Sequence, residues 1–328
     1  MNLVFITDAW QPIVGGGQKL YWEVLSRLAK QGWRIIVVTR ALVNNQSASF
    51  FHSNLKVIRL GPVLPFFNPF GRFWFTIQSF IYCLRYNPDR FMATTWFPAI
   101  TLQLIKLVKK TPIVLLAIGF GSRLLWLEDL ITRKFKYDLI ITDDWVFKSA
   151  KFIPNGVDLP RRQAGFPKYS DFTFLTIARN EPRKGIPILI QAFKLVKAQF
   201  PQVQLHLFGP GFKTISQEQL NQELNQSHCL IIPSLREGHP LILFEAWAHR
   251  LPVIATEIGS VSQFINQANG YLVPSGDVQA LAEAMIKVLN NKKLSQLGAA
   301  GYQIVKNYTW DKTAKQYSQL LSSNSFPN

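Results

Sequence analysis

The stretch Ile231–Thr256, IIPSLREGHPLILFEAWAHRLPVIAT, holds a strand, a loop, a helix and a second strand in immediate succession. The apolar runs at its two ends indicate buried strands, and Pro240 is typical of the first residue of a helix. Strands that alternate with helices in this way form a parallel sheet covered on both faces. The stretch therefore predicts an α/β fold.

Two carboxylates in this stretch suggest a ligand. Glu237 lies in the loop beside Gly238, and Glu245 lies inside the expected helix. Gly238 lets backbone approach a ligand closely, and the amides that follow Pro240 at the helix start, up to Ile242, offer partial positive charge to an anion. A nucleoside diphosphate would fit there. Two isolated carboxylates, however, are more often a solvated loop residue and a helix-face residue, so the interpretation depends on the neighbouring motifs.

The Glu-x7-Glu spacing, followed by a helix and Leu-Pro-Val-Ile-Ala-Thr, resembles the retaining nucleotide-sugar glycosyltransferases of the GT-B type (group 1, family 4). That family includes sucrose-phosphate and lipid mannosyl transferases. The resemblance implies two Rossmann-like parallel-sheet domains facing a central cleft. It also implies that Glu237 contacts the hydroxyls of the donor sugar and that Glu245 accepts from the ribose hydroxyls. The donor-binding set then includes the residues between them, Gly238, His239, Pro240 and Leu241.

The strand Phe172–Ala178 is followed at once by RNEPRKG, in which four residues separate Arg179 from Lys184. A basic loop of this kind is by itself often no more than a solvated surface. The Arg-x4-Lys-Gly pattern nevertheless resembles the diphosphate clamp of the same family, in which two fixed cations balance the charge on the leaving diphosphate. We therefore predict that Arg179 and Lys184 act with Glu237 in catalysis and that neither a metal nor a cofactor is required.

Further family features divide the chain. FIPNGVD, residues 152–158, resembles the interdomain signature and predicts an acceptor domain over 1–155 and a donor domain over 156–310. The final helix, 311–321, is expected to return to the first domain. Expected strands in the second half are 173–177, 204–208, 229–233, 252–256 and 271–273. Ligands in such sheets bind beyond the carboxyl ends of the strands, where Arg179, Gly209, Glu237 and Gly259 all fall.

The first half opens with a strand at Leu3–Thr7, a run of three glycines at residues 15–17, and a helix with apolar residues at helical spacing. A glycine loop at a helix N-terminus is suited to phosphate, although such a run is often a simple turn. Its position between strand and helix matches the family's N-terminal glycine loop. Gly16 and Gly17 are therefore assigned to the donor site by resemblance.

Departures from the family pattern lie in the same half. Family members commonly carry histidines where this chain has Ile118-Gly119 and the histidine-free stretch 93–97. Asp143 and Asp144 resemble a metal-binding pair only weakly, and a turn or a capped helix start explains them better. These departures leave open a second function, a catalytically weak nucleotide-sugar-binding or scaffold protein at the membrane. An epimerase or a phosphorylase fits less well, because we find no lysine placed to hold a pyridoxal cofactor.

Composition limits the partners. The 328 residues carry 36 basic and 19 acidic side chains, a formal net charge of +17, and the first 155 residues hold the larger excess. An anionic membrane surface is therefore an expected partner, alongside a glycan or lipid-linked acceptor. Nucleic acid ranks below it because neither a basic aromatic RNA motif nor a recognition helix appears. Cys83 and Cys229 are expected as reduced core thiols.

The stretch 63–84, VLPFFNPFGRFWFTIQSFIYCL, is dense in aromatic residues, but its polar residues interrupt any membrane span. It predicts an amphipathic helix over 73–84 that lies in a membrane interface, in an acceptor groove or in the domain core. Arg72, Arg85 and Arg90 on its flanks favour the interface. The N-terminal sequence shows no basic leader, so we expect a cytoplasmic protein with peripheral contact to the inner face of the plasma membrane.

Overall fold

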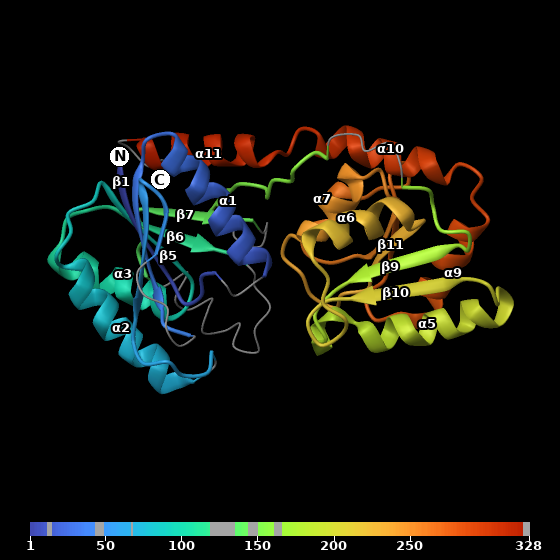
Figure 1. Ribbon diagram of the computed structural model, residues 1–328, viewed down its shortest axis with the longest axis horizontal. Coiled ribbons are helices and arrows are strands. Elements are labelled where there is room, and N and C mark those ends of the chain that lie inside the picture. The colour runs from blue at the N-terminus through green and yellow to red at the C-terminus, as the bar shows by residue number, and fades with distance from the viewer. Residues whose placement is uncertain are drawn as a thin grey trace. The chain divides into compact units, whose positions relative to one another are not determined.

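The computed structural model describes residues 1–11, 15–42, 49–66, 68–118, 135–143, 150–160 and 166–323; for residues 49–52 it describes the backbone alone. The chain forms two compact units: the first is Met1–Pro154 with Trp310–Asn328, and the second is Asn155–Thr309 (Figure 1). Gly119 and the second member of the acidic pair, Asp144, lie outside the described residues.

Within the described residues, the first unit holds an eight-stranded sheet in the order β3-β4-β2-β1-β5-β6-β7-β8. All neighbouring strands are parallel except β3, which runs antiparallel to β4 at one edge. β1 pairs with both β2 and β5, so the chain reverses its direction of winding beside β1, as in a Rossmann sheet. The strands are β1 (Asn2–Thr7), β2 (Arg34–Arg40), β3 (Ser49–His52), β4 (Leu55–Leu60), β5 (Arg90–Thr94), β6 (Ile113–Ala117), β7 (Leu139–Thr142) and β8 (Lys151–Phe152).

Helices cover both faces of this sheet because successive residues of a strand point to opposite sides. Val4 and Ile6 of β1 pack in a core cluster with residues of α2 (Pro69–Cys83) and α3 (Phe97–Val108). Phe5 faces the other way, toward α1 (Gly16–Lys30) and α11 (Trp310–Ser322). The two helices α1 and α11 pack against each other, and Arg27 Nε donates to Asp311 Oδ1 at 2.7 Å.

The aromatic stretch forms α2, which begins earlier than the sequence analysis predicted. The prediction placed the start at Phe73, whereas the helix starts at Pro69. Asn68 is its N-cap, and the Asn68 side chain accepts from the Gly71 amide at 2.9 Å. An Asn followed by Pro is a standard start signal, because the cap satisfies a free amide and proline has none to satisfy. The aromatic density of the stretch had obscured that signal.

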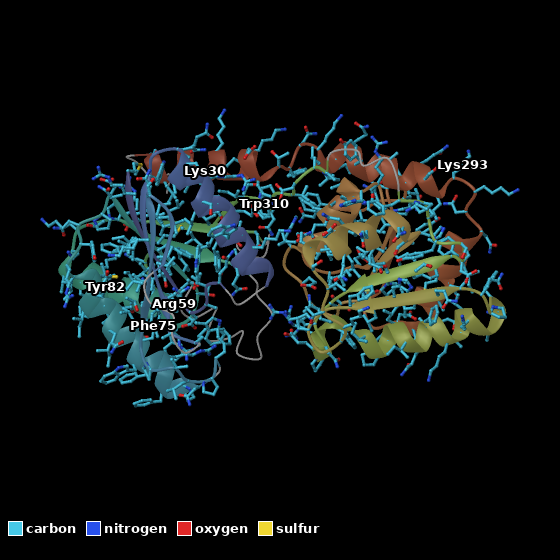
Figure 2. The ribbon with its side chains drawn as sticks, viewed as in Figure 1. Lys30, Arg59, Phe75, Tyr82, Lys293 and Trp310 are labelled. Atoms are coloured by element: carbon cyan, nitrogen blue, oxygen red, sulfur yellow. The ribbon has the colours of Figure 1, made fainter. Side chains whose placement is uncertain are left out.

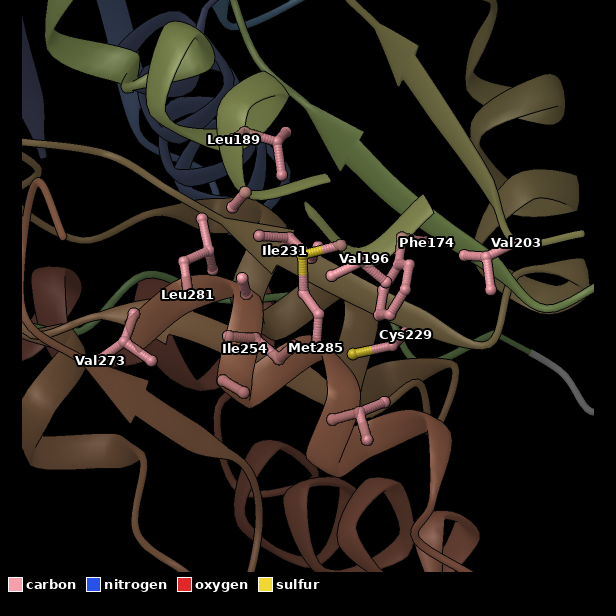
Figure 3. Packing of buried hydrophobic residues seen from close by; sticks show 14 residues of the cluster. Phe174, Leu189, Val196, Val203, Cys229, Ile231, Ile254, Val273, Leu281 and Met285 are labelled. Atoms are coloured by element: carbon pink, nitrogen blue, oxygen red, sulfur yellow. The ribbon is translucent and has the colours of Figure 1, made fainter. Parts of the chain in front are cut away.

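The second unit holds a five-stranded parallel sheet in the order β10-β9-β11-β12-β13. The predicted strand positions are confirmed, with β11 and β12 each one residue shorter than expected. Phe174, Ile231 and Met285 belong to the core cluster between this sheet and its helices (Figure 3). The strands are β9 (Thr173–Ile177), β10 (Gln204–Phe208), β11 (Cys229–Ile232), β12 (Val253–Thr256) and β13 (Tyr271–Val273).

The helices of the second unit connect these strands. They are the 3-10 helix η1 (Pro182–Lys184), α5 (Ile186–Gln199), α6 (Gln217–Gln226), α7 (Leu241–Ala248), α8 (Val261–Phe264), α9 (Val278–Leu289) and α10 (Leu294–Val305). Pro240 is the N-cap of α7 and not its first residue, one position away from the prediction. Cys83 and Cys229 are buried free thiols, as expected. Within the described residues no helix combines the length and the apolar content that crossing a bilayer requires.

Candidate functional site

Four loops meet at one edge of the sheet of the second unit. Because β9, β10, β11 and β12 are parallel, the loops that follow them all leave from their carboxyl ends. Arg179 follows β9 and Gly209 follows β10, while Glu237 and Gly259 lie in the loops after β11 and β12. The parallel topology thus places the predicted residues at the same edge, although they are far apart in sequence.

Glu237 is held by three partners from two of these loops. Lys184 Nζ forms an ion pair with Glu237 Oε1, and Arg183 Nη1 lies 3.6 Å from Oε2. Ser234 Oγ donates to Oε1 at 3.0 Å. The side chains of Lys184 and Glu237 are 15% and 10% exposed, so solvent screens their attraction only in part. The carboxylate is therefore fixed in position and charge-balanced.

Arg179 joins the same group of charges through Glu181. Glu181 Oε1 lies 3.5 Å from Arg179 Nη1, and Oε2 accepts from Arg183 Nε at 2.8 Å. Burial opposes the charge of Glu181, but the attraction of Arg183, and then of Arg179, outweighs it and lowers the pKa of Glu181. The ionised carboxylate thus holds two guanidinium groups beside the Lys184–Glu237 pair. We call Arg179, Glu181, Arg183, Lys184 and Glu237 the charge cluster.

Glycines allow these loops to pack closely on one another. Gly185, directly after the 3-10 helix, has φ +65, and a Cβ at this position would overlap the carbonyl oxygen of Pro233. Gly259 has φ +49, and a Cβ there would overlap the carbonyl oxygen of Glu237. The amide of Leu235 donates to the carbonyl oxygen of Arg183 at 2.7 Å, which ties the loop after β11 to η1. These contacts set the position of the charge cluster.

Gly209 has a comparable packing role. Its φ is +128, and a Cβ would overlap the carbonyl oxygen of Ala178, the residue between β9 and Arg179. The sequence analysis assigned Gly209 to the donor site. The structure shows that glycine is required here by backbone geometry in any case, because an L side chain would be strained and would clash.

His239 has its side chain in the protein core. The imidazole is 7% exposed and lies edge-on to the rings of Phe244 and Phe264, with centroids 4.5 and 5.2 Å away. Ser260 Oγ donates to the carbonyl of Gly238 at 2.8 Å, and it therefore accepts from His239 Nδ1, 3.1 Å away. Any contact that His239 makes with a ligand is left to its backbone. Its side chain ties the Glu237 loop to the loop after β12.

Burial lowers the pKa of His239 to about 3. The imidazole therefore stays neutral in the folded chain at pH values at which it would be protonated in the unfolded chain. The stability that this histidine contributes is complete above pH ~6.5 and is lost as the pH falls toward ~3, by about 1.4 kcal/mol per pH unit. Between pH 7 and pH 5, we expect the His239→Phe variant to lose about 2 kcal/mol less folding stability than the wild type loses. Chemical denaturation at the two pH values measures this loss, and an unchanged loss in the variant would contradict the assignment.

The remaining predicted residues lie as follows. Glu245 is a partly exposed residue of α7, and Leu241 opens that helix, which has no side-chain cap. Gly16 and Gly17 open α1 in the first unit, where a Cβ on Gly17 would lie 3.2 Å from Tyr21 Oη. Arg183, Ser234 and Glu181 were not among the residues predicted from the sequence. Their signal was present in the motifs RNEPRKG and PSLREG, where each stands within three residues of a residue that was chosen.

Two of the arginines expected to flank an interface lie elsewhere. Arg72 Nε is 3.6 Å from Asp8 Oδ2, and its guanidinium lies over the Phe66 ring. Arg90 is 9% exposed and donates to the carbonyl oxygen of Ser323 at 2.8 Å. Both side chains are thus turned inward and stabilise the first unit. Arg85, in contrast, is exposed just after α2.

Two Rossmann-like units, the second with a charge cluster at the carboxyl edge of its sheet, define a protein of the GT-B fold class. Sucrose-phosphate synthase from Thermosynechococcus elongatus has this fold, with a TM-score of 0.85 at 22% identity over 97% of this chain and 98% of that chain. Anabaena HepE, solved in complex with UDP, gives a TM-score of 0.71 at 16% identity over 98% of this chain and 100% of that chain.

Residues 171–291 match the family model of glycosyl transferases group 1. A phosphatidyl-myo-inositol mannosyltransferase of Mycobacterium leprae is 28% identical over 232 residues, which are 60% of each chain. The capsular polysaccharide biosynthesis glycosyltransferase CapM of Staphylococcus aureus is 26% identical over 178 residues, 46% of this chain and 47% of that protein. The chain thus matches about half to three-fifths of the length of these relatives.

Proposed function

We propose that this protein transfers a sugar from a nucleoside-diphosphate donor to a hydroxyl acceptor with retention of configuration. The observation that carries the proposal is the charge cluster, in which Lys184 and Arg183 pair with Glu237 and Glu181 holds Arg179 beside them. The cluster lies at the carboxyl edge of the sheet, within the residues that match the group 1 glycosyltransferase model. A diphosphate and the polar face of a sugar require such a combination of fixed cations with an oriented carboxylate.

Each residue of the site then has a distinct task. Arg179 and Lys184, with Arg183 beside them, stabilise the charge that grows on the diphosphate as its bond to the anomeric carbon breaks. Glu237, oriented by Ser234, accepts hydrogen bonds from the sugar hydroxyls, and Glu245 accepts from the ribose. The acceptor oxygen attacks from the face that the diphosphate leaves, and its proton passes to the departing phosphate oxygen. This route needs no protein nucleophile.

The finer substrate assignment follows from the relatives. Their names point to a lipid headgroup and to a capsular polysaccharide as acceptors, and we propose a lipid-linked or polysaccharide acceptor for this chain as well. HepE was solved with UDP, so uridine donors are the first to test. A lipid-linked acceptor would bring the protein to the cytoplasmic surface of an anionic membrane, which agrees with its formal net charge of +17.

A thermal-shift screen against UDP-, GDP- and ADP-sugars tests the donor proposal. We expect one nucleotide class to raise the melting temperature of the wild-type protein, because a ligand that binds only the folded chain stabilises it. The same donor should give a smaller shift in Glu237→Gln and in Glu245→Gln, with Glu283→Gln on the exposed side of α9 as the matched control. If no nucleotide sugar stabilises the wild type, the proposed function is wrong.

Transfer is expected to proceed with a chelator present, because fixed cations can carry out the charge balancing that a bound divalent ion performs in other transferases. Initial rates in EDTA, compared with rates in added Mg²⁺ or Mn²⁺, measure this. A loss of activity in EDTA that is restored by one of these ions would show that the cations of the charge cluster are insufficient.

The catalytically weak alternative is favoured by one observation, the histidine-free segment that follows β5 at residues 95–97, where family members commonly place a histidine. On that alternative the protein would bind a nucleotide sugar and transfer it to no acceptor. A donor-induced thermal shift without turnover across lipid-linked, glycan and simple sugar acceptors would support it. Turnover with any of these acceptors excludes it.

A further inference from the structure

Helix α2 exposes a row of large apolar side chains along one side. They recur at positions i, i+3, i+4, i+11 and i+14, which share one face of an α-helix. The opposite side of α2 carries Phe75, labelled in Figure 2, and Cys83, and both are fully buried in the core cluster with residues of the sheet. The exposed fractions are 61% for Phe70, 57% for Phe73, 41% for Trp74, 52% for Ile81 and 41% for Leu84.

Helix α3 extends this row. Ser79 Oγ and Thr101 Oγ1 lie 2.9 Å apart between the two helices, and Lys109 Nζ donates to the carbonyl of Tyr86 at 2.7 Å. The C-terminal ends of α2 and α3 therefore lie together. At the end of α3, Leu107 is 81% exposed and Val108 is 59% exposed. We call these seven residues the apolar face: Phe70, Phe73, Trp74, Ile81, Leu84, Leu107 and Val108.

Single exposed apolar residues are ordinary, but seven of them on two helices that pack together mark a binding surface. The charges around the apolar face indicate what it binds. Residues 69–88 and 97–112 contain no Asp or Glu, while they contain five Lys and Arg residues. Of these, Arg85 and Lys110 are exposed at the C-terminal ends of the two helices. The binding partner must therefore accept inserted aromatic side chains and carry negative charge that attracts cations.

An anionic lipid surface meets both requirements. Aromatic side chains favour the boundary between headgroups and acyl chains, and each nearby cation gains attraction from anionic headgroups. A second copy of the chain fits less well, because an isologous contact would bring Arg85 and Lys110 of both copies together without acidic partners from these helices. Charge thus distinguishes the two occupants.

We propose that α2 and the end of α3 lie flat in the interface of an anionic membrane, with the apolar face entering it and Arg85 and Lys110 contacting headgroups. This inference rests on the membrane contact in the proposed function, and it does not depend on sugar transfer. Of the three arginines expected from the sequence it keeps Arg85, whereas Arg72 and Arg90 are turned inward.

Co-sedimentation with vesicles of phosphatidylglycerol and phosphatidylcholine tests the proposal. We expect the wild type to bind, and Phe73→Ser with Trp74→Ser to weaken binding by about tenfold or more. The matched control is Ile190→Ser with Leu195→Ser, two residues of α5 that are 41% and 44% exposed in the other unit. Binding of the control should stay within about twofold of wild type, since these residues are outside the apolar face.

Arg85→Gln with Lys110→Gln should lower binding to the anionic vesicles by several-fold and should make the remaining binding less sensitive to salt. Far-UV circular dichroism and the donor-induced thermal shift establish that each variant is folded and report on the donor site separately. The proposal is overturned if the wild type does not bind the vesicles. It is likewise overturned if the Phe73→Ser/Trp74→Ser variant binds them as well as the Ile190→Ser/Leu195→Ser control does. A third contradicting result would be a wild-type dimer in sedimentation velocity together with a monomeric Phe73→Ser/Trp74→Ser variant.

Discussion

Lys184→Ala is expected to lower turnover by about 10²–10³-fold, which corresponds to about 3–4 kcal/mol of lost transition-state stabilisation. The ammonium group is largely buried in its ion pair with Glu237, so it acts where water screens it poorly. Its attraction to a diphosphate increases as the bond to the sugar breaks and charge accumulates on the leaving group. The loss should therefore appear mainly in kcat and only weakly in KM.

Lys213→Ala is the matched control, because Lys213 is an exposed lysine in the neighbouring loop after β10 and pairs with no member of the charge cluster in the described structure. Its turnover should equal that of the wild type. Steady-state kinetics with the donor identified by thermal shift measure both variants. If Lys184→Ala keeps the turnover of the wild type, Lys184 has no part in stabilising the leaving group.

Gly185→Ala is expected to destabilise the protein by about 2–5 kcal/mol and to abolish the donor-induced thermal shift. A left-handed backbone costs an L residue about 1–2 kcal/mol, and overpacking adds about 1–3 kcal/mol. The clash is with a backbone carbonyl, that of Pro233, which cannot rotate away as a side chain would. Relief of the clash must separate η1 from the loop that carries Ser234 and Glu237.

Gly276→Ala isolates the backbone contribution. Gly276 has φ +83, yet a Cβ there would meet only Leu235 Cδ2 at 3.9 Å, an ordinary contact. This control should lose about 1–2 kcal/mol and keep its response to donor. Chemical denaturation and the thermal shift measure both variants. Equal behaviour of the two would mean that the contact between Gly185 and Pro233 does not hold the site together.

The sheet of the second unit could be predicted from sequence because its signals are local. Most of its strands are short apolar runs bounded by glycine, proline or polar residues, as Cys229–Ile232 and Tyr271–Val273 show. The helix Val278–Leu289 is marked by Asp277, whose side chain accepts from the amide of Ala280 at 2.9 Å. Resemblance to the family then selected Glu237 and Lys184 from the loops.

Other features depended on the tertiary structure. His239 stands between two predicted site residues, yet its side chain packs in the core, because the aromatic rings around it come from residues up to 25 positions away. Arg72 and Arg90 look like surface cations in the sequence and are turned inward. The burial of a polar side chain depends on which distant elements cover it, and no local pattern records that.

The sequence by itself determined the strands of the second unit and the glycines that permit tight loops, since these depend on interactions over a few residues along the chain. The partner of Lys184 was decided only by the folded sheet. The parallel neighbours β9 and β11 bring Glu237 beside a lysine 53 positions earlier, and Ser234 and Arg183 fix the carboxylate there. Strand register and loop packing, which are long-range properties, create that group of charges.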